Sequence, residues 1–437
     1  MAARPRVAVV GAGAAGLATL KALRDAAVPA VAFETAGTVG GLWVYGTPGS
    51  PAYRTLHLNT SKGRTQFADH PMPADWPDYP DHTRVAGYLA DYADRFGLRE
   101  DVLLGHTVER VTRAADDTWT VQATGPDGPV RVDVEAVVVA NGHNRVPKLP
   151  DGYPGECTAE QLHSHDYRGP DQLAGRRVLV VGGGNSAMDI AVDASYAATR
   201  TLLSLRRGVW VVPKYLLGRP SDTLNGALAR RLPWRLRQRI SQTMLTTTVG
   251  PPSRYGLPAP AHGFLQDHPT LSDGLLSRLT HGDIHARPGI ARFAGARVEF
   301  IDGRTDEVDL VVWCTGYRVA VPFLDAALLG DGADRLPLYR HVFHLDAPGL
   351  AFVGLMQSTG AAFPLVEAQA RLVAGRLAGT WAPPDPARQA AACRAELCAA
   401  TARWGQRRPH MRVDFDAYLA ELDRELAAGR RRAGAAR

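Results

Sequence analysis

Three glycines near the N-terminus have the spacing of a dinucleotide-binding turn. Gly11, Gly13 and Gly16 follow a short run of valine and alanine at 7–10 and precede an alanine- and leucine-rich stretch at 14–26. In such a turn the first glycine permits the tight bend, the second lets a pyrophosphate approach the backbone, and the third lets the helix pack closely. The N-terminus of the following helix attracts phosphate through its free N–H groups and its partial positive charge. The spacing therefore predicts a bound dinucleotide.

An acidic residue completes this unit. A second β run at 30–33 ends at Glu34, eighteen residues after Gly16. A carboxylate at this distance meets the two hydroxyls of an adenosine ribose. Because strand, glycine turn, helix, strand and acid follow in the expected order, we favour a cofactor-binding turn over a glycine turn that binds nothing.

A second strand–turn–helix unit lies in the middle of the chain. A β run at 176–181 leads into Gly182 and Gly184, and Asn185, Ser186 and Ala187 follow at the start of a predicted helix. We expect this turn to hold a second dinucleotide, with the Ser186 hydroxyl donating to its pyrophosphate. Two such turns in one chain indicate two dinucleotides held at once, such as a flavin and its nicotinamide reductant.

The ends of the two units differ in charge. Glu34 accepts ribose hydroxyls and repels a 2′-phosphate, whereas Arg206 and Arg207 stand at the matching place in the second unit. Guanidinium groups are planar, always charged and suited to a phosphate. We therefore assign FAD to the first turn and NADPH to the second; the alternative is that the two arginines form a solvated face.

These turns need an α/β fold to position them. We expect two Rossmann-like dinucleotide-binding domains of the three-layer type, with the NADPH domain inserted into a discontinuous FAD domain. The predicted division is 1–168 for the first part of the FAD domain, 169–313 for the NADPH domain, and 314–437 for the second FAD part with C-terminal helices. Further predictions are helices at 85–96, 366–378 and within 219–261, an antiparallel meander at 107–111, 119–123 and 130–134, and strands at 135–140, 309–313 and 349–354.

Composition narrows the class of protein. The chain has 437 residues, a net charge of +6 and 45% hydrophobic residues, and its basic residues are dispersed apart from 430–432. Nothing in this pattern calls for nucleic acid, and no apolar run is long enough to span a membrane. The four cysteines form no Cys-x-x-Cys pair, which argues against a dithiol or zinc centre. A β run starts within six residues of Met1, which leaves no space for a signal peptide, and we expect a cytoplasmic enzyme.

Several further motifs make the chain resemble the flavin-containing monooxygenases. The family's identifying sequence aligns on Cys157, Ala159, His163 and Tyr167; the first two positions depart from it, and Tyr167 stands where type I Baeyer–Villiger enzymes carry Trp. The matching segments, besides the first glycine turn and its acid, are 40–43 (Gly-Gly-Leu-Trp), 59–62 (Asn-Thr-Ser-Lys), 67–69, 142–143, 163–167, 184–187, 206–208, 315–317 and 353–355.

The resemblance implies a reaction cycle. NADPH reduces FAD, oxygen adds to form a C4a-hydroperoxyflavin, and one oxygen atom passes to a soft nucleophile, an amine nitrogen or a thioether sulfur. It implies a small-molecule substrate and O2 as partners and a soluble enzyme that is often a homodimer. It fits the lack of a Ser/His/Asp or paired-carboxylate arrangement, because the cofactor carries the chemistry.

The resemblance also implies roles for single residues. It makes Asn59 the catalytic candidate, with its amide beside the flavin and NADP⁺. It places Gly41, Leu42, Trp43 and Thr60 around the flavin, although core packing is an equal interpretation for Trp43. His57 would touch FAD phosphate or ribose, or serve the structure alone. No metal is expected, because His163 and His165 lack a third ligand.

Three alternatives stay open at this stage. A Baeyer–Villiger oxidation of a ketone uses the same cofactors. An NADPH oxidase or disulfide reductase is a second possibility, although the missing Cys-x-x-Cys argues against the reductase. A non-catalytic protein that binds NADPH and FAD as a sensor is the third. The sequence does not identify the substrate, and it assigns no chemistry to the middle of the chain.

Overall fold

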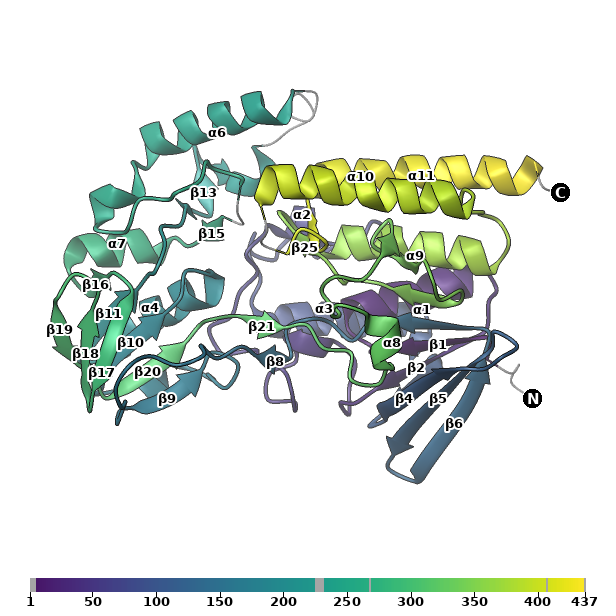
Figure 1. The fold of residues 1–437 in the computed structure, drawn as a ribbon, viewed down its shortest axis with the longest axis horizontal. Coiled ribbons are helices and arrows are strands. Elements are labelled where there is room, and N and C mark those ends of the chain that lie inside the picture. Colours follow the sequence, from purple (N-terminus) through teal and green to yellow (C-terminus); the bar gives the residue numbers. More distant parts are fainter. Residues whose placement is uncertain (1–4, 225–231, 267–268, 406–407, 436–437) are drawn as a thin grey trace.

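Two sheets organise the computed structural model, which describes residues 5–224, 232–266, 269–405 and 408–435 (Figure 1). The larger sheet has seven strands, and the first five in spatial order run parallel. The two strands at its far edge are antiparallel. In spatial order its strands are β3 (Val102–Leu104), β2 (Ala30–Glu34), β1 (Val7–Val10), β7 (Ala136–Val139), β24 (Leu350–Phe352), β23 (Phe343–His344) and β22 (Leu338–Tyr339).

Both faces of this sheet are covered. β1 and β7 are buried at every residue, as expected of strands sandwiched between two layers. Helices α1 (Ala14–Asp25) and α9 (Phe363–Leu377) pack against one face with α3 (His82–Arg95) beside them. The antiparallel meander β4 (Thr107–Arg113), β5 (Trp119–Gly125) and β6 (Gly128–Val134) covers the other. The predicted three-layer arrangement and the predicted meander are confirmed.

The smaller sheet is entirely parallel and has the same layers. Helices α4 (Asn185–Ala197) and α7 (Gly274–His281) pack on one side. The meander β17 (Ile290–Ala294), β18 (Arg297–Phe300) and β19 (Thr305–Glu307) packs on the other. Its strands, in spatial order, are β16 (Ile284–Arg287), β11 (Arg200–Ser204), β10 (Arg177–Val181), β20 (Leu310–Trp313) and β9 (Glu160–His163).

Two short strands connect the sheets. The chain leaves the larger sheet after β7 through β8 (Val146–Pro147) and returns to it through β21 (Tyr317–Arg318). β8 and β21 pair with each other in antiparallel fashion and run between the two halves of the molecule (Figure 1). The second dinucleotide-binding fold is thus inserted into the first. Because β9 already belongs to the smaller sheet, we propose to move the first boundary from residue 168 to a point before Glu160.

The segment 219–261 differs from its prediction of a largely helical stretch. It begins as β14 (Arg219–Pro220), which forms a hairpin with β13 (Tyr215–Leu216). Residues 225–231 lie outside the described chain, and α6 (Trp234–Thr248) is followed by the short 3₁₀ turn η5 (Pro252–Tyr255). Prolines at 251, 252, 258 and 260 explain why the helix does not continue, since proline removes a backbone donor.

Two long helices complete the fold at the C-terminus. They are α10 (Pro386–Trp404) and α11 (Phe415–Ala435), and between them β26 (Arg412–Val413) pairs with β25 (Gln357–Ser358). Both helices lie over α9 on the side of the molecule away from the β4–β6 meander (Figure 1). Across the part of the chain that the structure describes, no helix combines the length and apolar character needed to cross a bilayer.

Candidate cofactor and active site

A cavity of about 900 Å³ lies at the carboxyl ends of the strands of the larger sheet. Residues that end β1, β2 and β7 line it, which is where open parallel sheets bind ligands. Its size falls in the range of cofactor sites. Nine of the residues predicted from the sequence line this cavity: Gly11, Gly13, Glu34, Gly41, Leu42, Trp43, Asn59, Thr60 and Asn185.

The first glycine turn has the geometry of a phosphate cradle. Gly11 has φ +105°, and a Cβ there would lie 2.7 Å from the carbonyl oxygen of Ala140. A Cβ on Gly16 would lie 1.9 Å from the carbonyl oxygen of Gly11, so this glycine serves the packing of the turn and does not line the cavity. Gly13 is the N-cap of α1 and has no side chain to occupy the free N–H groups there. These N–H groups are available to a pyrophosphate.

Gly41 approaches this turn from the side. It begins the 3₁₀ turn η1 (Gly41–Trp43), and a Cβ on Gly41 would lie 3.0 Å from the Cα of Gly13. The preceding Gly40 donates its N–H to the carbonyl of Ala12 at 3.0 Å. The Gly-Gly-Leu-Trp segment is thereby held against the first glycine turn, with Leu42 and Trp43 on the cavity wall.

Glu34 stands at one end of the cavity, at the end of β2. Its two carboxylate oxygens each accept one backbone N–H at 2.8 Å, from Ala12 and from Ala36. These bonds fix the carboxylate beside the turn. A carboxylate offers about four acceptor positions, so two are left for the hydroxyls of a ribose.

Asn59 also lines the cavity. Its neighbour Leu58 is buried and bonded through its N–H to the carbonyl of Pro80 at 2.9 Å, which fixes the backbone beside it. The Asn59 amide forms no hydrogen bond with any residue of the described chain, while the next hydroxyl, that of Thr60, shares a 2.8 Å bond with Thr65. An amide with no protein partner in a cofactor cavity is available to a ligand.

His57 lies outside the lining of the main cavity. It is exposed, and its Nδ1 lies 2.8 Å from the carbonyl oxygen of Thr55. A bridge to Asp81 holds its backbone at the start of α3. A contact of His57 with FAD stays a prediction, and these contacts support the alternative that His57 serves the structure alone.

Several cavity residues were not predicted as site residues. The segment after β7 contributes His143 and Arg145, and the segment between β24 and α9 contributes Gln357. Burial lowers the pKa of His143 to about 4, so its imidazole is neutral at pH 7. Their position just beyond the carboxyl ends of two buried strands is the sequence signal that would have found them. Trp404 and Arg412, from the C-terminal segment, line the far wall without any such signal.

The second glycine turn repeats the geometry of the first. Gly182 has φ +144°, and a Cβ there would lie 2.3 Å from the carbonyl oxygen of Cys314. Gly184 is the N-cap of α4 and has open space around it, and Ser186 is half-buried in the first turn of the helix. The Asn185 side chain accepts the N–H of Leu271 at 3.0 Å and lines the main cavity.

Ala187, predicted as a cofactor contact, lies in the first turn of α4. Its side chain is fully buried in the core of the inserted fold, and its N–H is bonded to the carbonyl of Gly184 at 3.0 Å. The side chain packs in the core and the N–H bonds within the first turn of α4, so neither group is left for a ligand. Its role is to let the helix pack.

Arg206 and Arg207 lie just beyond β11, which ends at Ser204. Both are exposed, and neither forms an ion pair with another residue among those described. Unpaired guanidinium groups at the end of the second strand of a dinucleotide fold are suited to a 2′-phosphate. They are outside the main cavity, in keeping with a second, separate cofactor position.

Comparison with known proteins identifies the family of this chain. The family model described as flavin-binding monooxygenase-like matches residues 4–430. The chain belongs to the flavin-binding monooxygenase-like family. It is 34% identical to flavin-containing monooxygenase 5 of Rattus norvegicus over 390 residues, which is 84% of this chain and 72% of the relative. It is 33% identical, with the same coverage, to the N-oxide-forming dimethylaniline monooxygenase 2 of Mus musculus.

A solved structure agrees with this family. The S-allyl-L-cysteine S-oxygenase of Allium sativum is 26% identical, covers 96% of this chain and 88% of its own, and superposes with a TM-score of 0.73. The predicted family and the predicted pair of Rossmann-type folds are thereby confirmed. The chain is an NADPH-dependent flavoprotein monooxygenase with FAD and NADPH as cofactors, as the sequence predicted.

Proposed function

We propose that this flavin-binding monooxygenase-like protein oxygenates a soft nucleophile, an amine nitrogen or a thioether sulfur, at the Asn59 end of the main cavity. The observation that carries the proposal is the Asn59 amide, which lines the cavity and has no partner among the described residues. A side-chain amide fixed beside the reacting atoms stabilises developing negative charge or donates a hydrogen bond to oxygen.

Different residues of the chain hold different parts of the cofactors. When bound, FAD and NADPH supply the electrons and the activation of O2. We propose that Gly11, Gly13 and the N-terminus of α1 hold the FAD pyrophosphate and that Glu34 holds the adenosine ribose. The neutral imidazole of His143 contributes a polar group without adding charge. Leu42 and Trp43 would form an apolar wall beside the flavin.

We propose that the second turn holds NADPH. Gly182, Gly184 and Ser186 would surround its pyrophosphate, and Arg206 and Arg207 its 2′-phosphate. Asn185 lies on both the second turn and the main cavity, which supports a nicotinamide that reaches from one fold toward the flavin of the other.

The names of two relatives support nitrogen and sulfur as acceptors, since one forms an N-oxide and the other is an S-oxygenase. We propose further that the protein is cytoplasmic, which the four free cysteines support. A homodimer is proposed from the resemblance alone, and light scattering of the purified holoenzyme tests it.

The test of the function is rapid mixing. The FAD-loaded protein is reduced by NADPH without oxygen and then mixed with O2, first alone and then with a thioether, a tertiary amine and a cyclic ketone. We expect a transient absorption band distinct from oxidised and reduced flavin, whose decay is accelerated by the thioether or the amine with formation of the oxide. Faster decay with the ketone alone, and lactone as product, would instead establish the Baeyer–Villiger reaction.

A further inference from the structure

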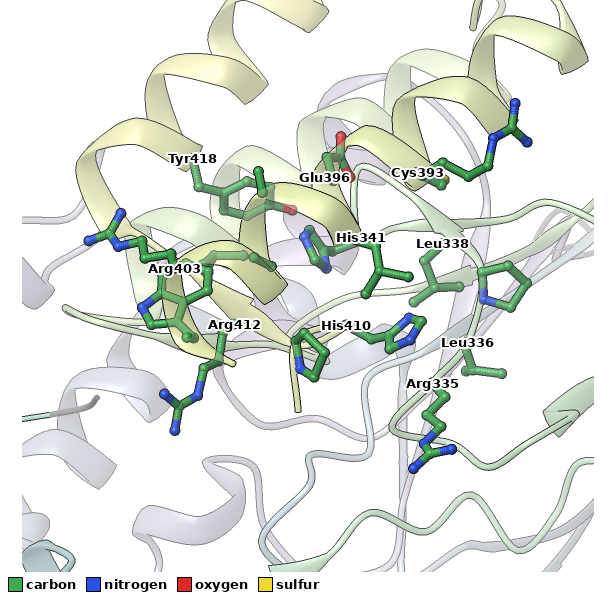
Figure 2. Close-up of a pocket in the computed structure, with 18 of the residues that line it drawn as sticks. Arg335, Leu336, Leu338, His341, Cys393, Glu396, Arg403, His410, Arg412 and Tyr418 are labelled. Atoms are coloured by element: carbon green, nitrogen blue, oxygen red, sulfur yellow. The ribbon is translucent and has the colours of Figure 1, made fainter. Parts of the chain in front are cut away.

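A second pocket of about 410 Å³ lies among the C-terminal helices. It is bounded by α10, α11 and the segment around β22 (Figure 2). It is partly open to solvent. Its wall combines aliphatic side chains with charged and imidazole side chains, and it is too small for a dinucleotide. The apolar residues of the wall include Leu336, Leu338, Leu345, Leu397, Ala400 and Val413.

Ion pairs fix the walls of this pocket. Arg340, directly after β22, forms ion pairs with Glu396 on α10 and Glu421 on α11. On the opposite side Arg403 lies 2.7 Å from the buried carboxylate of Asp414. Ion pairs therefore tie both helices to their surroundings at the wall of this pocket.

Two residues belong to both cavities. Trp404 and Arg412 line the small pocket and also the far wall of the cavity that holds Asn59. The reason is local: α10 ends at Trp404, and Arg412 pairs in β26 with Gln357, itself a residue of the main cavity. These two side chains therefore border both spaces.

We propose that the small pocket is the vestibule through which the organic substrate reaches the flavin cavity, with Trp404 as the partition between them. This inference rests on the proposed function. The volume of the pocket would admit a small organic molecule, and the aliphatic part of its wall would contact an apolar body next to the nitrogen or sulfur atom. NADPH, which is highly charged, enters elsewhere, at the exposed Arg206 and Arg207.

The helix α10 provides a matched pair of variants. Cys393 lines the pocket and is half-buried, whereas Cys398, one turn and a half further along the same helix, is exposed and lies outside the lining. Cys393→Phe fills part of the pocket, and Cys398→Phe adds the same ring to the surface. Ala390→Phe narrows the pocket from one turn earlier and replaces Cys393→Phe if that protein does not fold.

The experiment compares these variants as FAD-loaded proteins with a slim and a bulky thioether. For Cys393→Phe we expect kcat/KM for the bulky thioether to fall about tenfold or more relative to Cys398→Phe. The rate of flavin reduction by NADPH should be the same in both. Equal kcat/KM values in the two variants for the bulky thioether would overturn the vestibule. If the unmodified enzyme oxygenates none of the nucleophiles, it is the proposed function that fails.

Discussion

The hydroxyl of Tyr53 donates a 2.6 Å hydrogen bond to the carboxylate of Asp189, and this bond joins the two dinucleotide-binding folds. Tyr53 precedes the Asn59 segment of the first fold, while Asp189 lies on α4, three residues after Ser186. One turn later on α4, Asp193 accepts the hydroxyl of Thr55 at 2.6 Å. The helix that starts at the second glycine turn is thus fixed against the fold that holds the flavin.

Loss of the Tyr53 hydroxyl should weaken this contact. Tyr53→Phe leaves the Asp189 carboxylate without its donor, at a cost of about 1–3 kcal/mol. We expect a lower Tm and, because α4 carries the proposed pyrophosphate site, a higher KM for NADPH. The control is Tyr196→Phe, which removes a hydroxyl from an exposed tyrosine on the same helix. Equal Tm values for the two variants would contradict the role of the bond.

Asp189 also predicts a pH dependence of stability. Burial raises its pKa to about 6, whereas an aspartate in an unfolded chain ionises near pH 4. The folded state therefore binds this proton more tightly. The stability that it contributes is fully present below about pH 4 and is lost as the pH rises through 6, by at most about 3 kcal/mol. Asp189→Asn retains an acceptor for Tyr53 and cannot ionise, so its Tm should change less between pH 4.5 and 7.5 than that of the unmodified protein.

Substitutions of two glycines in the first turn should distinguish an effect on FAD binding from an effect on folding. A Cβ on Gly13 would meet Gly41 at 3.5 Å, an ordinary contact, and the φ of Gly13 is −77°. Gly13→Ala should therefore fold but bind FAD more weakly, because the methyl group occupies the pyrophosphate position. In Gly16→Ala the new methyl group would lie 1.9 Å from the Gly11 carbonyl oxygen, and little folded protein is expected. Flavin content and circular dichroism of the two purified variants check this.

Replacement of the two exposed arginines should weaken the binding of NADPH and not that of NADH. In Arg206→Ala/Arg207→Ala we expect KM for NADPH to rise about tenfold to a hundredfold, as charge-assisted hydrogen bonds to phosphate are lost. KM for NADH, which lacks that phosphate, should change little and serves as the internal control. An equal rise for both would show that the arginines do not recognise the 2′-phosphate.

Asn59→Ala should uncouple the reaction. The variant should bind FAD and be reduced by NADPH at the normal rate, since the glycine turns are intact. Oxygenated product should fall about a hundredfold, the cost of losing one fixed hydrogen-bond donor at the reacting atoms. Hydrogen peroxide should account for the NADPH consumed. Product yield and peroxide are measured together, and an unchanged ratio would exclude the role.

The parts of the site that could be predicted are those in which chain order determines geometry. A strand, a glycine turn and a helix are contiguous, so Gly11, Gly13 and Glu34 could be placed from spacing alone. The contacts of Asp189 could not, because its partner Tyr53 is 136 residues away in the chain. The bridge between His57 and Asp81 likewise joins residues that are separated in the sequence.

The residues of the C-terminal wall of the main cavity could not be predicted from the sequence for the same reason. Trp404 and Arg412 reach it because β26 pairs with β25, a contact between segments more than fifty residues apart in sequence. Helical periodicity predicted that the C-terminal stretch is helical, which α10 and α11 confirm. Helical periodicity does not indicate which cavity these helices adjoin.

The pairing of β8 with β21 brings the entry and the exit of the inserted fold side by side, with Pro147 opposite Tyr317. Because the inserted fold begins and ends at neighbouring points, it can be exchanged for the corresponding fold of another protein by joining the chain at β8 and at β21. The reductant-binding fold is therefore an exchangeable cassette: the corresponding block of a relative with another nicotinamide preference could be spliced in at these strands. Such a chimera would need to keep the residues of the inserted fold that bond to the first fold, among them Asp189, Asp193 and Asp222.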